Sequence, residues 1–155
     1  MIMKGDIAVN NETARFVAKV KGLWTKPKAK IEVWDYSAVC TGIDRIEARI
    51  KANNNLKIVV PEIVISRLSE TKGNAACLLR VYDYLLECES NKLCFGITDK
   101  KYRALPEPEQ IMSIAEAYYR QGGDVTLVTC DEEQTRIADR KKINYIYFEA
   151  TPISN

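Results

Sequence analysis

Strand-forming runs alternate with helix-period segments over residues 31–149, and this alternation most constrains the fold. Strands are predicted over residues 31–39, 56–60, 92–98, 124–130 and 143–149. Helices are predicted over about 41–53, 61–71, 75–89, 108–121 and 132–142. A strand, a helix and a second strand in succession build a parallel sheet with helices packed on it. The sequence therefore predicts an α/β fold, a three-layer sandwich with a central, mainly parallel sheet.

The chain of 155 residues is long enough for one domain with a sizeable core. We divide it into a basic N-terminal extension, 1–30, and the α/β domain, 31–155. The extension holds seven Lys and Arg residues against two acidic ones, so it can steer the chain toward a polyanion or form a solvated surface. The alternation over 16–20 can add a strand or hairpin to the sheet or to another subunit. Because that strand would leave an edge to cover, a homodimer is one expectation.

Several classes of protein are disfavoured by composition. The chain has no histidine, so it cannot build a Ser-His-Asp or Cys-His nucleophile system. Its five cysteines form no CxxC pair and are expected to be reduced. No apolar run is long enough to span a membrane, no signal-peptide core is found, and the expected location is the cytoplasm. The lack of a GxGxxG or GxxxxGK loop disfavours a nucleotide-dependent small-molecule enzyme.

Two acidic residues fall at the ends of predicted strands, where ligands of parallel sheets bind. Asp35 lies late in the strand 31–39, and Asp131 directly follows the strand 124–130. Ser37 and Thr129 lie two residues from these aspartates, on the same predicted strand face. Asp131 also fits as the N-cap of the next helix, whereas Asp35 has no such explanation within its predicted strand. The pair is therefore a candidate site.

Four segments resemble, in order and spacing, those of the PIN-domain ribonucleases. Within that family, the segments most resemble the PIN domain that is attached to PhoH-type ATPases. The segments are VWDYSAV, IVVPEIVISRLSETKGNAA, EQIMSIAEAYY and DVTLVTCDEEQTRIADRKKINYI, within residues 31–148. The last segment is the most specific. The resemblance implies a ribonuclease in which clustered carboxylates hold one or two Mg²⁺ or Mn²⁺ ions, for which no histidine is required.

The resemblance transfers cleanly at both ends of this pattern. Asp35 matches the first aspartate of the family and Ser37 its hydroxyl partner. Asp131 matches the last aspartate, Thr129 the preceding threonine, and Glu133 an acidic residue often found two positions later. These matches imply that Asp35 and Asp131 are metal ligands and catalytic residues, and that Ser37 and Thr129 lie at the substrate.

The two middle positions depart from the family pattern. Arg67 stands where a glutamate is usual, and Glu70, one helical turn later, is the expected substitute. Pro108 occupies the place of the third acid, so Glu107 or Glu109 could turn toward the site or simply favour the helix N-terminus. The resulting prediction for the catalytic and metal-binding residues is Asp35, Glu70, Glu109 and Asp131.

Arg67 leaves the function open between alternatives. It can bind a substrate phosphate in an active ribonuclease. It can instead replace the metal ion electrostatically, which would give a PIN-like module that binds RNA or protein without cleaving. A third alternative is the toxin of a toxin-antitoxin pair, which would require an antitoxin partner.

Overall fold

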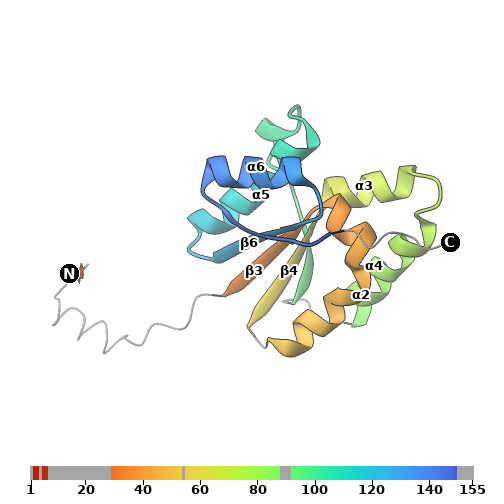
Figure 1. The fold of residues 1–155 in the computed structure, drawn as a ribbon, viewed down its shortest axis with the longest axis horizontal. Helices are drawn as coiled ribbons and strands as arrows, with labels where there is room; N and C mark the ends of the chain where they lie inside the picture. The colour runs from red at the N-terminus through yellow and green to blue at the C-terminus, as the bar shows by residue number, and fades with distance from the viewer. Residues whose placement is uncertain (1, 4, 7–28, 54, 88–91, 150–155) are drawn as a thin grey trace.

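A computed structural model describes residues 2–3, 5–6, 29–53, 55–87 and 92–149, and these ranges form a layered α/β fold (Figure 1). Within them, parallel strands pair in the order β5-β4-β3-β6-β7. The strands are β3 (Lys30–Trp34), β4 (Leu56–Pro61), β5 (Leu93–Gly96), β6 (Asp124–Thr129) and β7 (Asn144–Tyr147). A separate antiparallel pair joins β1 (Ile2–Met3) to β2 (Gly5–Asp6). The parallel central sheet confirms the predicted fold class.

Helices cover both faces of the sheet. They are α2 (Tyr36–Ala52), α3 (Glu62–Glu70), α4 (Ala75–Glu87), α5 (Glu107–Arg120) and α6 (Glu132–Lys141), with a short 3₁₀ helix η2 (Lys100–Tyr102). Helices α2, α3 and α4 contact one another, and α5 contacts α6. Figure 1 shows α5 and α6 on the opposite side of the sheet from α2 and α4. The arrangement follows from right-handed connections, because the chain runs outward from β3 to β5 and then crosses back to β6.

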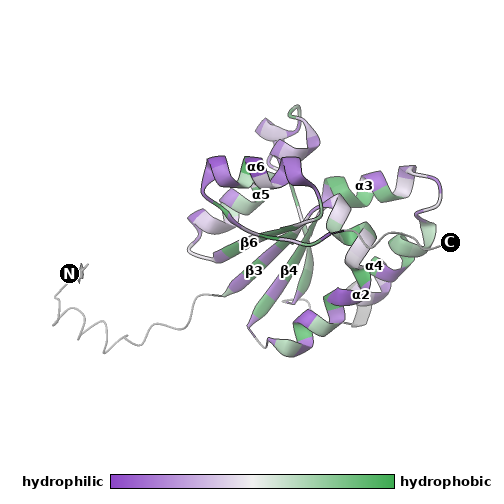
Figure 2. Ribbon diagram, viewed as in Figure 1, coloured by the Kyte–Doolittle hydropathy of each residue, from purple (hydrophilic) through white to green (hydrophobic). Residues whose placement is uncertain are grey.

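The core lies between these layers and is centred on β3, β4 and β6, which run deepest through the hydrophobic interior (Figure 2). Most residues of these three strands are buried, which is typical of parallel strands covered by helices on both faces. The largest fully buried side chains include Trp34, Ile58, Met112 and Leu127. No helix in the described ranges is long and apolar enough to cross a membrane.

The predicted strand 31–39 is wrong in its second half. β3 ends at Trp34, and α2 begins at Tyr36, five residues before the predicted start at Thr41. Asp35 caps this helix by accepting a hydrogen bond from the backbone N–H of Ala38. The apolar residues after Asp35 therefore belong to the buried face of a helix. Because these residues have a composition typical of a strand, the sequence did not indicate that Asp35 is the N-cap of α2.

The other elements agree with their predicted positions to within a few residues, and the predicted strand 92–98 is shorter, as β5. The possible strand over 16–20 lies outside the described residues, as does most of the extension 1–30.

Candidate active site

The candidate site lies where the chain direction across the sheet reverses. β3 and β6 are neighbours, but the chain leaves β3 toward β4 and leaves β6 toward β7. In an open parallel sheet this switch point opens a crevice at the carboxyl ends of the strands. A cavity of about 550 Å³ occurs there, and its walls include Asp35, Ser37, Arg67, Glu107, Pro108 and Asp131. Residues of α2, α3, α5 and α6 thus meet in one cavity with the residues that directly follow β3 and β6.

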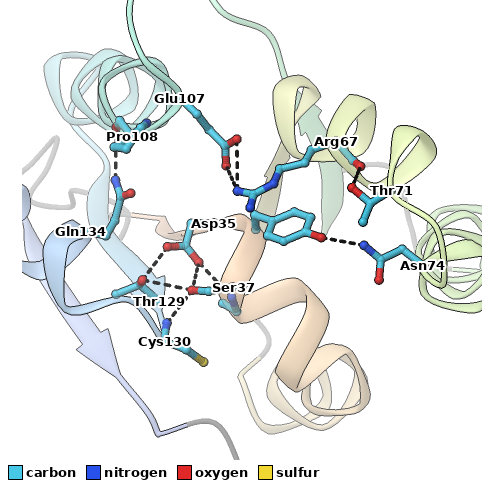
Figure 3. Close-up of polar contacts among 12 residues, drawn as sticks. Asp35, Ser37, Arg67, Thr71, Asn74, Glu107, Pro108, Thr129, Cys130 and Gln134 are labelled. Atoms are coloured by element: carbon cyan, nitrogen blue, oxygen red, sulfur yellow. Dashed lines mark hydrogen bonds and ion pairs between the residues drawn. The ribbon is translucent and has the colours of Figure 1, made fainter.

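Asp35 is a buried carboxylate, with 3% of its surface exposed, fixed by three hydrogen bonds (Figure 3). Oδ1 accepts from the Ser37 hydroxyl at 2.7 Å and from the Ala38 N–H at 2.9 Å. Oδ2 accepts from the Thr129 hydroxyl at 2.5 Å. These donors offset part of the cost of desolvating the carboxylate. The aspartate in an otherwise apolar run is therefore both a helix cap and a group presented to the cavity.

Ser37 and Thr129 link the ends of the two central strands. The Ser37 hydroxyl accepts from the Cys130 N–H at 2.8 Å, and the Thr129 hydroxyl accepts from the Asp131 N–H at 2.9 Å. The two hydroxyl oxygens lie 3.4 Å apart. Ser37 reaches Asp35 from the first turn of α2, so the strand-face argument for this contact was wrong. The hydroxyls hold Asp35 in a single orientation.

Burial raises the pKa of Asp35 above its ordinary value, because the charged form is poorly solvated. The hydrogen bonds from Thr129, Ala38 and Ser37 lower this pKa, and the negative charge of Asp131 raises it further. The charge of Asp131 therefore affects the pKa of Asp35. Such coupling is expected where carboxylates share a cavity.

Asp131 lines the cavity and is the N-cap of α6. Its Oδ1 accepts from the Glu133 N–H at 3.0 Å, and its side chain is exposed. Asp131 therefore caps α6, as one of the two interpretations of the sequence predicted. Because the carboxylate also lines the cavity, capping and ligand binding are compatible at this residue.

Arg67 forms the opposite side of the cavity. Its guanidinium carbon lies 3.7 Å from the centre of the Tyr36 ring, and its Nη1 lies 3.1 Å from Glu107 Oε2 and 3.3 Å from Oε1. The Tyr36 hydroxyl accepts from Asn74 Nδ2 at 2.6 Å. These contacts connect α2, α3, α5 and Asn74, the residue before α4, and Figure 3 draws the ion pair between Arg67 and Glu107. A fixed cation is thereby held beside the acidic residues.

Glu70 and Glu109 are not among the residues that line this cavity, so it brings together two of the four predicted carboxylates, Asp35 and Asp131. Glu70 is exposed on the last turn of α3, and Glu109 is half-buried in the first turn of α5. Glu107, the alternative at that helix start, faces Arg67 instead. Its position depends on the packing of α3 against α5, 40 residues apart in sequence.

Gln134 and Tyr36 are structural parts of the site that sequence reasoning missed. Buried Gln134 donates from Nε2 to the Pro108 carbonyl at 3.1 Å, which ties the start of α5 to α6. A polar residue among the inward positions of the predicted helix 132–142 was the available signal for Gln134. The signal for Tyr36 was an aromatic residue next to Asp35.

The donor chemistry at the cavity suits a hard divalent cation, although only in part. In the described ranges, no group of three or more His, Cys, Asp or Glu side chains is arranged to hold a metal ion. Mg²⁺, however, is commonly held by one or two carboxylates, with waters and substrate phosphates completing its shell. Asp35 and Asp131 supply carboxylate oxygens of that kind. The residues present therefore fit an ion that is completed by water and substrate.

Comparisons with known proteins bear on the fold. No protein-family model and no curated protein matches the chain. A solved domain of a functionally unknown protein from Methanocaldococcus jannaschii DSM 2661 is similar, with 18% identity and a TM-score of 0.56. The match covers 83% of this chain and 96% of that domain. At this identity the likeness concerns the fold alone.

Proposed function

We propose that the protein is a metal-dependent ribonuclease with a PIN-like domain, which hydrolyses phosphodiester bonds of RNA at the cavity between β3 and β6. One observation carries the proposal. Two aspartates from neighbouring strand ends and the guanidinium of Arg67 line a single cavity at the switch point of the sheet. Carboxylates can bind Mg²⁺ or Mn²⁺, and a guanidinium can bind a phosphate, so the cavity offers both groups that RNA cleavage needs.

Each residue has a separate role in this proposal. Asp35 and Asp131 would hold the ion, which when bound supplies an activated water and neutralises charge on the scissile phosphate. Ser37 and Thr129 orient the Asp35 carboxylate through their hydroxyl hydrogens. Arg67 binds a phosphate of the RNA backbone through charge-assisted hydrogen bonds. The burial of Asp35 keeps its carboxylate partly shielded from water, which strengthens electrostatic interactions there.

Cleavage of a labelled RNA in the presence and absence of Mn²⁺ tests this function. We expect metal-dependent cleavage that Asp35→Asn and Asp131→Asn each reduce by at least about a hundredfold, because ligand loss removes transition-state stabilisation. Glu70→Gln and Glu109→Gln are matched controls, since these carboxylates lie outside the cavity, and both should retain activity. Full cleavage by Asp35→Asn, or cleavage unaffected by chelator, would contradict the proposal.

A second candidate is a non-catalytic module that binds RNA. The Arg67–Glu107 ion pair favours it, because a fixed cation already neutralises one acidic residue of the cavity. This module would bind RNA equally well with chelator and with Mn²⁺, and it would leave the RNA intact. Binding that strengthens with Mn²⁺ and ends in cleavage would exclude it.

The proposed substrate has consequences for partners and location. RNA is the expected partner and the cytoplasm the expected compartment. The basic residues of the extension 1–30 would add contacts to the RNA backbone. Deleting residues 1–28 should then weaken RNA binding and reduce its salt dependence.

A further inference from the structure

We propose that a second cavity binds a ribose of the RNA substrate through its 2′-hydroxyl group. This cavity has a volume of about 310 Å³. The residues that line it are Glu62, Ile63, Ser66, Thr98, Arg103 and Gln110. The inference rests on the proposed function and adds to it the part of the molecule that selects RNA over DNA.

The second cavity shares two helices with the cavity of the candidate active site. Ser66 and Arg67 are successive residues of α3, and Ser66 lines the second cavity whereas Arg67 lines the first. Gln110 and Glu107, about one turn apart on α5, are divided in the same way. Residues that follow β4 and β5 line the second cavity, and residues that follow β3 and β6 line the first. The two cavities are therefore separated by two strand spacings, which is about 10 Å, and one RNA strand can occupy both.

Thr98 gives the second cavity a polar group that a ligand can satisfy. Only 4% of the Thr98 surface is exposed. In the described ranges, its hydroxyl oxygen is the only buried side-chain nitrogen or oxygen atom without a hydrogen-bond partner. Such groups are rare in folded proteins, because a buried hydroxyl that forms no hydrogen bond lowers stability. A hydroxyl group bound in the adjoining cavity would supply a partner.

The other polar groups of the second cavity fit a ribose hydroxyl. The Glu62 carboxylate and Gln110 Oε1 accept hydrogen bonds, and Gln110 Nε2 already donates to two backbone carbonyls, at 2.8 and 3.1 Å. Phosphate oxygens only accept, whereas a 2′-hydroxyl donates and accepts. It can therefore donate to Glu62 and accept from the hydroxyl of Ser66 or Thr98. Among the described residues that line the cavity none is aromatic, which disfavours a stacked base as the occupant.

Arg103 provides a cation for the phosphate next to that ribose. Its Nε donates to the Thr98 carbonyl at 3.3 Å, which anchors the side chain at the second cavity. In the part of the chain that the structure describes, its two terminal nitrogens form no hydrogen bond and no ion pair. A guanidinium with both terminal nitrogens available can bind a phosphate by charge-assisted hydrogen bonds. The cavity thus offers partners for the sugar and for the phosphate of one nucleotide.

Binding of three oligonucleotides of one sequence to the full chain tests this assignment. They are RNA, 2′-fluoro RNA and DNA, each labelled with fluorescein, and their anisotropy is measured in chelator so that none is cleaved. 2′-Fluoro RNA keeps the sugar pucker of RNA but cannot donate a hydrogen bond from the 2′ position. We expect the wild type to bind RNA about tenfold more tightly than 2′-fluoro RNA, because hydrogen bonds to charged groups are the stronger ones. DNA should bind no more tightly than 2′-fluoro RNA.

Two variants test the residues of the second cavity. Glu62→Gln removes the charge of the acceptor, and Thr98→Val replaces the hydroxyl by a methyl group of similar size. Each should lose most of the preference for RNA over 2′-fluoro RNA. Thr98→Val should do so without loss of stability, since its hydroxyl has no partner in the free protein. The matched control is Glu70→Gln, because Glu70 lies on the same helix, α3, but outside the cavity, and it should keep the full preference.

Two results would overturn the ribose assignment. One is equal binding of RNA and 2′-fluoro RNA by the wild type, and the other is a full preference in both variants. The cleavage assay tests the proposed function separately. If the wild type cleaves RNA with Mn²⁺ but shows no preference in chelator, the ribonuclease stands and the ribose assignment falls. If it does not cleave but shows a preference that both variants lose, the cavity binds ribose and the chain is not a ribonuclease.

Discussion

Asp35 is a buried carboxylate whose hydrogen bonds do not fully offset its burial, so its pKa is raised. The folded protein then holds this proton more tightly than the unfolded chain does. The stability that Asp35 contributes is greatest below its ordinary pKa of 3.8 and is lost as the pH rises through the folded pKa. At neutral pH the charged carboxylate therefore lowers the free energy of unfolding.

Asp35→Asn should remove this cost, since asparagine caps helices as well as aspartate does. Without metal, we expect the two proteins to differ by only a few tenths of a kcal/mol near pH 3.5. The variant should become increasingly more stable than the wild type as the pH rises toward 8. Urea unfolding over this pH range measures the difference. A constant difference at all pH values would show that Asp35 keeps an ordinary pKa.

Individual site residues differed in how well the sequence predicted their positions. Asp35, Ser37, Thr129 and Asp131 lie near the ends of predicted parallel strands, whose carboxyl ends meet at one sheet edge. Their placement at one edge of the sheet could be expected from local pattern, but the contact of Asp35 with Thr129 could not, because it requires β3 and β6 to be neighbours. The sequence could not show that Glu107, and not Glu109, lines the cavity, because the position of Glu107 depends on its ion pair with Arg67 of another helix. Long-range ion pairs leave no periodic signal in a single sequence.

At the scale of elements, the start of α2 is the segment on which the site depends, and its boundary was the least predictable. α2 carries Ser37 in its first turn and deviates from helical geometry at Gly42, where φ is −122° and ψ is 23°. The Phe148 ring, which follows β7, packs beside this deviation. An ideal Cβ on Gly42 would lie 2.8 Å from Phe148 Cζ. A contact between segments 106 residues apart thus shapes the helix, and no helical period reveals it.

Gly42→Ala tests this contact. The added methyl group would push against Phe148, which also packs near Trp34 and under Arg45, so the ring has little room to move. We expect a loss of about 1–3 kcal/mol in the free energy of unfolding, as for overpacking elsewhere, less any gain in helix propensity. In a Phe148→Ala background, Gly42→Ala should be neutral or stabilising. Chemical unfolding of the four proteins measures the coupling, and equal effects in both backgrounds would contradict it.

At the scale of the molecule, the order of the strands in the sheet determines where the candidate site lies. The alternation of strands and helices predicted a parallel sheet, but several strand orders satisfy that pattern. In the observed order, β5-β4-β3-β6-β7, β3 and β6 are neighbours, and this places Asp35 beside Thr129. The order depends on which strands bury the most apolar surface, which is a property of the whole core. In the described ranges β5 and β7 are the sheet edges. The possible added strand over 16–20 and the homodimer would cover such edges, and both stay predictions.

A metal ion bound only to the folded protein stabilises the whole molecule by mass action, and this gives a global test of the proposed site. At a Mn²⁺ concentration a hundredfold above the dissociation constant, the gain is about 2.7 kcal/mol. For a chain of this size that corresponds to a rise of about 5–10 °C in melting temperature. Calorimetry with chelator and then with Mn²⁺ measures the rise.

The same measurement on Asp35→Asn should reverse the order of the two proteins. In chelator at pH 8 the variant should melt above the wild type, because it lacks a buried charge. In Mn²⁺ it should melt below the wild type, because it lacks a ligand. Glu70→Gln serves as the control and should follow the wild type in both conditions, since Glu70 lies outside the cavity. If Mn²⁺ raises the melting temperatures of wild type and Asp35→Asn equally, the ion binds elsewhere and the burial of Asp35 serves the fold alone.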